Sequence, residues 1–412
     1  MDRPLRFCMI TTFYPPYNFG GDGIFVHRLS NELAQSGHHV DVIHCVDSYR
    51  LLARSDPLKT HQDYPNVVVH SLRSPFGFLS PLATYQTGFP LLKSRRIRQV
   101  LDKGFDVIHY HNISLVGGPK ILEYGEGIKL YTMHEYWLIC PTHVLFRFNR
   151  AACTQRHCLL CSLACKRLPQ WWRYSRLLQS TVKHVDAFIA QSLFARDKHL
   201  EMGLNLPIVH IPSFIPAADN TMPSSEEVQA VRVQQPYFLF VGRLEKLKGL
   251  QTLIPVFQND RRAHLLIAGR GSYEPQLRQL ARGSENILFL GHLRPGQLDP
   301  LYRGAVALIV PSVCYEIMPL VIIEAFKQAT PVLARNIGGT PELVAESGGG
   351  FLYDTTEQLM AAMDQLLTND SLRRELGTSG YRAYQDNWTA EAHLNRYFTL
   401  IQEVAAARGR PL

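Results

Sequence analysis

The sequence of 412 residues lacks long apolar runs, and none reaches the 18 or so residues that a membrane-spanning helix needs. The first apolar stretch, LRFCMITT, is short, and because no small-residue cleavage site follows it, we expect no signal peptide. The fingerprint G-x-G-x-x-G is also absent, so no dinucleotide cofactor is indicated. These absences favour a cytoplasmic protein.

Carboxylates are scarce in the first half of the chain. Residues 1–215 carry 24 Lys and Arg against 15 Asp and Glu, whereas the remainder carries 19 against 20. A net charge of +9 on one half predicts an anionic partner for it, either a membrane surface or a nucleic acid. Helix-turn-helix, RNP and zinc-finger patterns are missing, so we expect no nucleic acid as partner. A basic nucleic-acid-binding protein is kept only as the competing interpretation from another functional class.

Short apolar runs alternate with helical segments along both halves, which is typical of parallel α/β sheets. The predicted strands are 5–12, 39–45, 67–72, 106–111, 129–134, 186–192, 207–212, 237–242, 264–269 and 286–291. Residues 211–229 are rich in Pro, Ser and polar residues and are typical of a linker. The pattern predicts two Rossmann-like domains.

One βαβ unit, residues 306–342, has the residues of a diphosphate site. The strand VALIVP is followed by a loop that holds Glu316, and the helix LVIIEAFKQ, which starts at Pro319, holds Glu324. A helix N-terminus offers unbonded N–H groups and a positive dipole end to a diphosphate, and carboxylates beside it can accept hydrogen bonds from hydroxyls. The alternative reading is two solvated surface glutamates.

Two cations follow another strand of the second half. Arg243 and Lys248 lie five residues apart in the loop after YFLFVG. At the carboxyl end of a parallel strand, a guanidinium fork and an ammonium suit phosphate groups. A solvated loop is the alternative.

These segments resemble the donor site of the family 4 retaining glycosyltransferases of GT-B fold. The resemblance rests on the two glutamates, on VGRLEKLKG, IAGRGS and LGHL, and on ATPVLARNIGGTPELV. It implies an α/β protein of two Rossmann-like, doubly wound domains that face each other across a cleft. It also implies a donor site with Glu316 on the sugar hydroxyls, Glu324 on the ribose, Arg243 and Lys248 on the diphosphate, Leu293 on the base, and the helix start at Met318, Pro319 and Leu320 on the leaving charge.

In the first half, the matching positions are Gly20, Gly21 and His134. The resemblance implies that the Gly-Gly pair lets the backbone approach the donor phosphates and the acceptor. It places the imidazole of His134, in TMHEYW, near the reacting sugar. His111 also ends a predicted strand, where residues of an open α/β sheet face the ligand.

The implied activity is transfer of a sugar from a nucleotide-diphosphate sugar (a UDP- or GDP-sugar) to a glycan, lipid-linked or small-molecule acceptor, as in polysaccharide biosynthesis. The resemblance implies retention of the anomeric configuration and no metal for catalysis. An epimerase of sugar nucleotides and a phosphorylase-like enzyme are alternatives on the same fold. We expect an acceptor domain at 1–215, a donor domain at 216–388, and a helix at 389–412 that crosses back to the first domain.

The first domain contains a cysteine-rich insertion at 140–165 that departs from the family pattern. The spacing of Cys158 and Cys161 suits a metal, so a structural zinc held by Cys153, Cys158, Cys161 and Cys165 is one hypothesis. Buried thiols and a redox or iron–sulfur role are the alternatives.

Next to the insertion, residues 167–178 combine Trp171, Trp172 and Tyr174 with three arginines. Helical spacing of basic, aromatic and leucine residues predicts an interfacial helix on an anionic membrane. A core helix with a basic exposed face is the alternative. We therefore expect a cytoplasmic protein that attaches peripherally to the inner membrane face, with a lipid-linked sugar as one acceptor.

Overall fold

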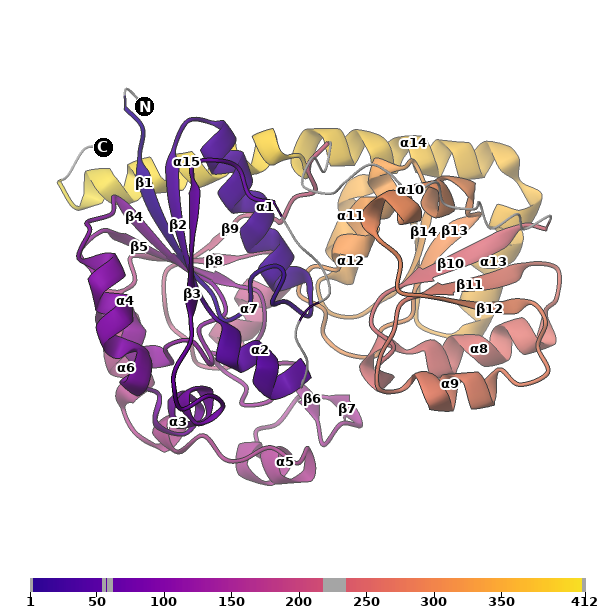
Figure 1. The fold of residues 1–412 in the computed structure, drawn as a ribbon. Helices are drawn as coiled ribbons and strands as arrows, with labels where there is room; N and C mark the ends of the chain where they lie inside the picture. Colours follow the sequence, from indigo (N-terminus) through magenta and orange to yellow (C-terminus); the bar gives the residue numbers. More distant parts are fainter. Residues whose placement is uncertain (1–2, 54–56, 58–61, 218–234, 410–412) are drawn as a thin grey trace. The chain divides into compact units, whose positions relative to one another are not determined.

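The computed structural model describes residues 3–53, 57, 62–217 and 235–409, which form two compact units (Figure 1). The first unit consists of Met1–His143, His157–Thr221 and His393–Leu412, and the second of Val144–Arg156 and Met222–Ala392. Most of the predicted linker, from residue 218 onward, lies outside the described residues. Among these residues, no helix combines the length and the apolarity that a membrane crossing requires.

The first unit is built on a parallel sheet of seven strands in the order β3-β2-β1-β4-β5-β8-β9. The strands are β1 (Arg6–Ile10), β2 (His39–Cys45), β3 (Val67–Leu72), β4 (Val107–Tyr110), β5 (Ile128–Met133), β8 (Ala187–Ala190) and β9 (Ile208–His210). Helices cover both faces of such a sheet, so its central strands are apolar on both sides. All the residues of β4, β5 and β8 are buried.

The helices of this unit connect successive strands, as parallel pairing requires. They are α1 (Gly21–Gln35), α2 (Val46–Ala53), α3 (Leu79–Thr87), α4 (Ser94–Leu101), α5 (Cys158–Ala164), α6 (Leu177–Thr181) and α7 (Leu193–Glu201). Short 3-10 turns lie between them: η1 (Leu91–Lys93), η2 (Pro119–Glu123), η3 (Trp171–Tyr174) and η4 (Val182–His184).

The last helix, α15 (Ala390–Ala407), contributes to the core of the first unit. The hydroxyl of Tyr397 lies 2.9 Å from Nδ1 of His109 in β4, and the two rings are stacked. The ring of His393 donates from Nδ1 to the carbonyl of Pro212 at 2.7 Å. All three side chains are buried, so the end of the chain is part of this core.

The second unit contains a parallel sheet of six strands in the order β12-β11-β10-β13-β14-β15. The strands are β10 (Tyr237–Val241), β11 (His264–Ala268), β12 (Ile287–Gly291), β13 (Ala307–Val310), β14 (Val332–Arg335) and β15 (Gly350–Tyr353). The helical segments are η5 (Lys246–Lys248), α8 (Leu250–Asn259), α9 (Glu274–Leu280), α10 (Pro295–Gly304), α11 (Leu320–Lys327), α12 (Thr340–Ser347), α13 (Thr356–Thr368) and α14 (Asp370–Asn387).

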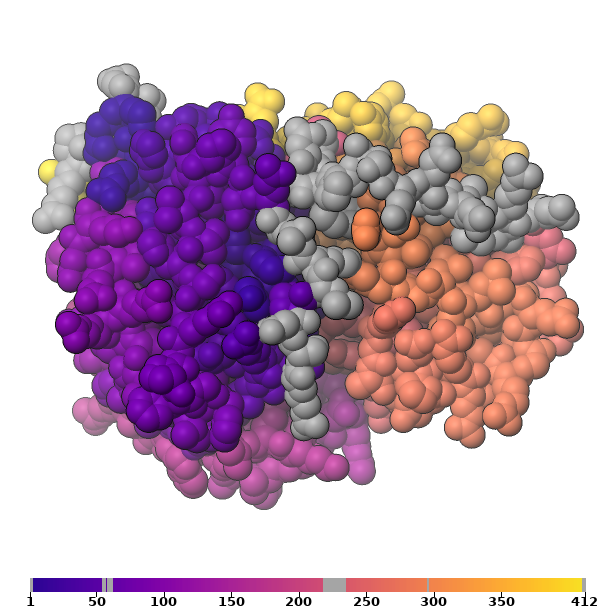
Figure 2. Space-filling model, viewed as in Figure 1, coloured from indigo at the N-terminus to yellow at the C-terminus, as the bar shows by residue number. Residues whose placement is uncertain are grey.

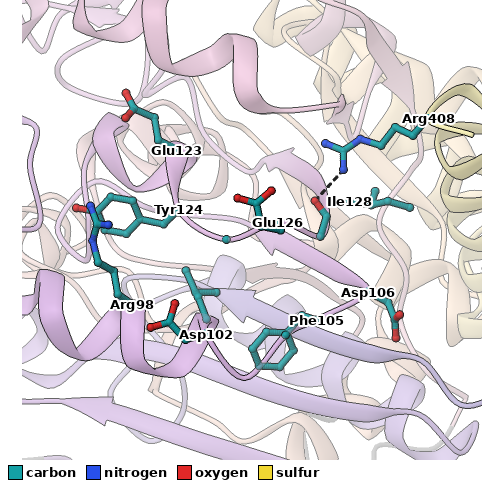
Figure 3. Close-up of a pocket in the computed structure, with 13 residues that line it drawn as sticks. Arg98, Asp102, Phe105, Asp106, Glu123, Tyr124, Glu126, Ile128 and Arg408 are labelled. Carbon is teal, nitrogen blue, oxygen red and sulfur yellow. Dashed lines mark hydrogen bonds between the residues drawn. The ribbon is translucent and has the colours of Figure 1, made fainter. Parts of the chain in front are cut away.

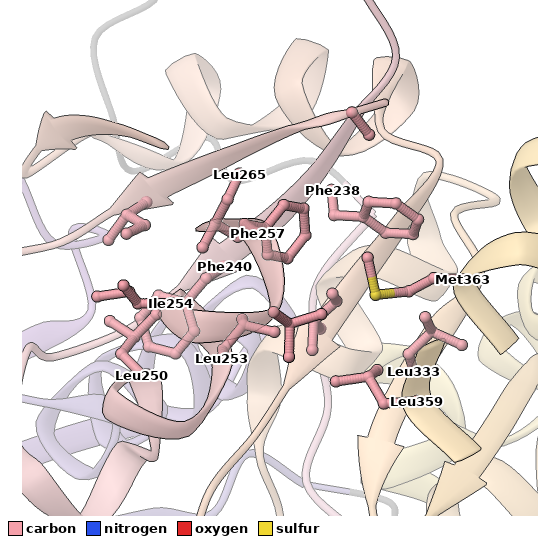
Figure 4. Packing of buried hydrophobic residues seen from close by; sticks show 14 of the residues in the cluster. Phe238, Phe240, Leu250, Leu253, Ile254, Phe257, Leu265, Leu333, Leu359 and Met363 are labelled. Carbon is pink, nitrogen blue, oxygen red and sulfur yellow. The ribbon is translucent and has the colours of Figure 1, made fainter. Parts of the chain in front are cut away.

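One buried core cluster of this unit lies between the sheet and helices α8 and α13 (Figure 4). Phe238 on β10 meets Phe257 on α8 edge to face at 5.8 Å, and Leu333 on β14 and Met363 on α13 belong to the same cluster. Burial of such a side chain stabilises the fold by about 1.5–3 kcal/mol. The strands of this sheet must therefore be apolar, which is why short apolar runs in the sequence predicted them.

Two local features differ from the sequence reading. A small antiparallel hairpin, β6 (Phe146–Arg147) and β7 (Ala151–Ala152), was not predicted. The continuous helix predicted at 167–178 was wrong, because η3 and α6 are separate there. Pro169 precedes η3 and cannot donate an N–H to a helix. Trp172 is buried and donates from Nε1 to the carbonyl of Tyr85 at 3.1 Å, which fixes η3 in the core instead.

Buried histidines make the stability of the fold depend on pH. Burial lowers the pKa of His44, His199 and His393 from 6.5 to about 4. Below pH 6.5 the unfolded chain binds protons that the folded protein does not, so stability is fully present above that pH and declines toward pH 4. At pH 5 each of these histidines therefore lowers the free energy of unfolding by about 2 kcal/mol.

We predict that His393→Asn reduces the stability lost between pH 7 and pH 5 by about 2 kcal/mol, because asparagine keeps a donor for Pro212 but does not titrate. Urea unfolding of both proteins at the two pH values measures the difference. An equal loss in the wild type and the variant would contradict the assignment.

Candidate functional site

The loops that follow β10 and β13 pack backbone against backbone at the carboxyl edge of the second sheet. Gly249 has φ +79°, and a Cβ there would lie 1.8 Å from the carbonyl oxygen of Pro311. The N–H of Val313 donates to the carbonyl of Leu247 at 2.9 Å. Only glycine permits both this conformation and this approach. The two loops therefore hold each other in position.

Across this junction Lys248 meets Glu316. The ammonium Nζ lies 2.6 Å from Oε1 of the carboxylate, and the Ser312 hydroxyl donates to the same oxygen at 2.7 Å. Only 23% of the lysine side chain and 14% of the glutamate side chain are exposed. The sequence placed Lys248 with Arg243, but the structure pairs it with Glu316 from a loop 68 residues later.

The pair keeps both groups charged. Burial alone would raise the pKa of the Glu316 carboxyl, but the charge of Lys248 and the hydrogen bonds from Lys248 and Ser312 outweigh it, so this pKa is lowered. Burial would lower the pKa of Lys248, and the Glu316 charge reverses that effect and raises it. The Glu316 carboxylate is therefore held in place, and its second oxygen can accept hydrogen bonds from a ligand.

Gly338, which the sequence reading quoted only within a motif, supports Glu316 from the loop after β14. Its φ is +69°, and a Cβ there would lie 2.6 Å from the backbone nitrogen of Glu316. The next residue, Gly339, donates its N–H to the Glu316 carbonyl at 2.8 Å. A third loop thus fixes the backbone that carries the carboxylate.

Helix α11 begins at Leu320 beside these loops, after Met318 and Pro319. Pro319 is at the N-cap in an extended conformation, and no side chain caps the helix. The first N–H groups of a helix have no partner within it, so this end suits an anion.

Glu324 lies farther along α11 and has a partner that sequence reasoning missed. The hydroxyl of Tyr302, on α10, donates to Oε2 of Glu324 at 2.9 Å. Burial, with the charge of Glu324 next to it, raises the pKa of Tyr302 well above its usual value. The phenol therefore remains a donor that orients the carboxylate, and no sequence spacing indicates this contact.

The other two residues predicted to bind the sugar donor, Arg243 and Leu293, are more exposed. The guanidinium of Arg243 is about half exposed and pairs with Glu245 at 2.8 Å. Its charge also lowers the pKa of Glu316, so it belongs to the same electrostatic environment. Leu293 follows β12 and is partly buried.

In the first unit, His134 follows β5 and lies next to His111, which follows β4. Nδ1 of His111 is 3.0 Å from Nε2 of His134, and the rings are stacked. Burial lowers the pKa of His134 to about 4, although Asp22 and a hydrogen bond with Gln191 act against it. The imidazole is therefore neutral at neutral pH, and the two histidines expected at strand ends are in contact.

Gly20 and Gly21 form the start of α1 near this pair. Gly20 is the N-cap, with an extended conformation, and its carbonyl accepts from the Asn18 amide at 2.8 Å. In the first turn, Asp22 accepts from the amide of Asn112 at 3.1 Å. The α1 start is thereby tied to the loop after β4, the strand that leads to His111.

The cysteines do not assemble a metal site in the part of the chain that the structure describes. All eight are thiols, and no group of three or more His, Cys, Asp or Glu side chains is placed to hold a metal ion among the described residues. The structure therefore gives no support to zinc at Cys153, Cys158, Cys161 and Cys165. Burial, together with Cys161, raises the pKa of Cys165, so this thiol stays protonated.

A cavity of about 740 Å³ in the first unit lies away from these residues (Figure 3). Its lining includes Asp106 and Ile128, at the amino ends of β4 and β5, and Arg408 from the segment after α15. His111 and His134 follow the carboxyl ends of the same strands. The cavity is therefore at the opposite edge of the sheet from them.

Comparison with known proteins gives matches over most of the chain. Residues 222–383 match the family model described as "Glycosyl transferases group 1", and residues 19–219 match that of "Glycosyltransferase Family 4". The two matches together span both units.

Individual proteins agree with these models. The chain is 29% identical over 368 residues to the glycogen synthase of Mycobacterium tuberculosis strain H37Rv, which covers 84% of this chain and 81% of that protein. Its fold is similar to sucrose-phosphate synthase from Thermosynechococcus elongatus, with a TM-score of 0.74 and 20% identity over 98% of this chain and 100% of the other. It is also similar to Anabaena HepE, solved in complex with UDP-glucose, with a TM-score of 0.63 and 16% identity over 98% and 99% of the two chains.

We predict that Gly338→Ala destabilises the protein by about 2 kcal/mol more than Gly283→Ala, because its Cβ must displace the backbone of Glu316. Gly283 is the matched control. Its φ is +80° and a Cβ there would have no atom within 4 Å, so the substitution carries the cost of the left-handed conformation alone, about 1 kcal/mol. Chemical denaturation measures both, and hydrogen exchange at the Gly339 N–H should accelerate only in Gly338→Ala. Equal destabilisation would contradict the supporting role.

Proposed function

The chain belongs to the group 1, family 4 glycosyltransferases and has their GT-B fold of two Rossmann-like domains, and from this premise we propose that it is a retaining enzyme that uses a nucleotide-diphosphate sugar. The observation that carries the proposal is the Lys248–Glu316 pair, held beside the N-terminus of α11. It combines a cation for a phosphate with a carboxylate for sugar hydroxyls.

The diphosphate would bind to Arg243, to Lys248 and to the N–H groups at the start of α11. As the bond between the sugar and the diphosphate breaks, negative charge develops on the leaving phosphate, and these donors stabilise it in place. Lys248 already lies against Glu316, so the pair positions the cation before the donor arrives. Arg243 is exposed enough to exchange Glu245 for a phosphate.

Glu316 would accept hydrogen bonds from hydroxyls of the donor sugar. Lys248 and Ser312 both bind its Oε1, which leaves Oε2 for the sugar. In Glu324 the Tyr302 hydroxyl donates to Oε2, and this oriented carboxylate would accept from the ribose. The loop that holds Leu293 would contact the base.

The first unit would bind the acceptor, and the backbone at Gly20 and Gly21 would approach both the donor phosphates and the acceptor. A neutral His134 can act near the sugar as a hydrogen-bonding group without adding a charge. The HepE complex with UDP-glucose supports a UDP-sugar as donor, and a GDP-sugar is the second candidate. A glycan, a lipid-linked sugar or a small molecule would be the acceptor.

We also propose a cytoplasmic location with peripheral attachment to the inner membrane face. The net charge of +9 on residues 1–215 supports this location, because anionic lipids attract Lys and Arg.

Glu316→Gln is predicted to lower kcat/KM for transfer from UDP-glucose by about 100-fold or more, the scale of one lost interaction with the developing transition state. Glutamine preserves the size of the side chain but removes the charge that holds Lys248. Glu274→Gln is the control, since Glu274 pairs with Arg278 on the surface helix α9. Unchanged turnover in a folded Glu316→Gln protein would refute the assignment.

Arg243→Ala is predicted to weaken UDP binding by about 10-fold or more while uridine binding is unchanged, because the guanidinium contacts phosphate only. Arg262→Ala is the matched control, with 58% exposure against 53% for Arg243 and with acidic partners of its own. Calorimetric titration measures both ligands. Similar losses for UDP and uridine would argue against a phosphate role.

A further inference from the structure

The first unit has an exposed apolar surface built from two segments that are distant in sequence. Residues 76–92 include α3, and residues 159–174 include η3 and all of α5 but its first residue. We name this the α3–α5 surface. Its most exposed large side chains include Phe78, Leu160, Trp171 and Tyr174, of which Trp171 is 64% exposed.

The two segments are joined by hydrogen bonds. The hydroxyl of Tyr85 on α3 donates to the carbonyl of Leu168 at 2.8 Å, and Nε1 of Trp172 donates to the carbonyl of Tyr85 at 3.1 Å. Figure 2 shows the purple and magenta segments meeting along the lower margin of this unit. The hydrogen bonds therefore hold α3 against the segment that carries Trp171 and Tyr174.

The two adjacent tryptophans of η3 have opposite environments. Trp172 is 4% exposed and lies 5.3 Å from the ring of Trp137. Its neighbour Trp171 lies 6.4 Å from the ring of Tyr174, and both are exposed. The core is thus complete without Trp171, and its exposure is not a result of loose packing.

The charge of the surface has one sign. In the first unit, residues 64–101 and residues 157–185, which include the two segments, each carry five Lys and Arg and no Asp or Glu. Lys166 and Arg167 are exposed within the α3–α5 surface, and Arg95, Arg96 and Arg176 are exposed next to it in the sequence. Exposed aromatic and leucine side chains on segments whose own charged residues are all cations match an anionic lipid interface.

We propose that the α3–α5 surface docks on a bilayer that contains anionic phospholipid, with Trp171, Tyr174, Leu160 and Phe78 entering the headgroup region. The inference rests on the proposed peripheral attachment and names its contact surface. A second copy of the chain is a poorer occupant, because a two-fold interface would bring the same cations together and neither segment carries a carboxylate to pair with them.

This docking has a consequence for the acceptor. Residues 76–92 follow the carboxyl end of β3, at the same edge of the parallel sheet as His134, which follows β5 directly. The acceptor side of the first unit would therefore face the lipid, which favours a membrane-anchored acceptor over a small soluble one.

The test is sedimentation of the full chain with vesicles of phosphatidylglycerol and phosphatidylcholine, and with phosphatidylcholine alone, at low and high salt. We expect binding to the anionic vesicles only, with a steep loss at high salt, because charges are screened within about 10 Å at 0.1 M. Leu160→Ser/Trp171→Ser should weaken binding by about 10-fold or more, since two apolar side chains no longer insert. Leu280→Ser/Met360→Ser is the control, as both side chains are exposed on the second unit.

Thermal unfolding and the stabilisation by UDP should be unchanged in both double variants, because all four side chains are exposed. Wild-type protein that stays in the supernatant with anionic vesicles would overturn the proposal, as would equal binding by the two double variants. Self-association that Leu160→Ser/Trp171→Ser abolishes, without vesicle binding, would assign the surface to a second copy instead. Vesicle binding without any effect of UDP would uphold the docking and reject the proposed donor.

Discussion

The ion pair between Lys248 and Glu316 is the constraint on which the candidate donor site depends. Each charge is largely withdrawn from water, and either one alone would be costly to bury. The pair is formed because Gly249 lets one loop touch the backbone at Pro311 and Gly338 lets another touch the backbone at Glu316. The loops that follow β10, β13 and β14 thus hold one another in position, and the start of α11 lies next to them.

The two units differ in the charges that they hold at their candidate sites. The second unit holds opposite charges at short distance, which suits a ligand that carries both phosphates and hydroxyls. Beside the sheet of the first unit, His109, His111 and His134 are in contact, and burial lowers the pKa of each. These rings form a neutral, hydrogen-bonding environment next to strand ends.

Much of the fold could be predicted from the sequence because strand-length apolar runs report burial on both faces of a parallel sheet. The positions of Glu316 and Glu324 relative to a helix start could also be predicted, since they depend on local spacing. The partner of Glu324 could not, because Tyr302 comes from α10 through a tertiary contact. The same limit applies to Trp171 and Trp172, for which only the packed structure decides which ring is buried.

The cysteine-rich insertion shows why residue type alone misleads about what holds a segment together. Its neighbour Arg173 lies over the rings of Trp172 and Trp137, at 4.4 and 5.5 Å, and donates to the carbonyl of Leu138. Burial lowers the pKa of this guanidinium to about 10, which leaves it charged at neutral pH. Carbonyls and aromatic faces, rather than a carboxylate, satisfy this cation. A segment without Asp or Glu can therefore be ordered from within, and its outer cations remain available to an anionic partner.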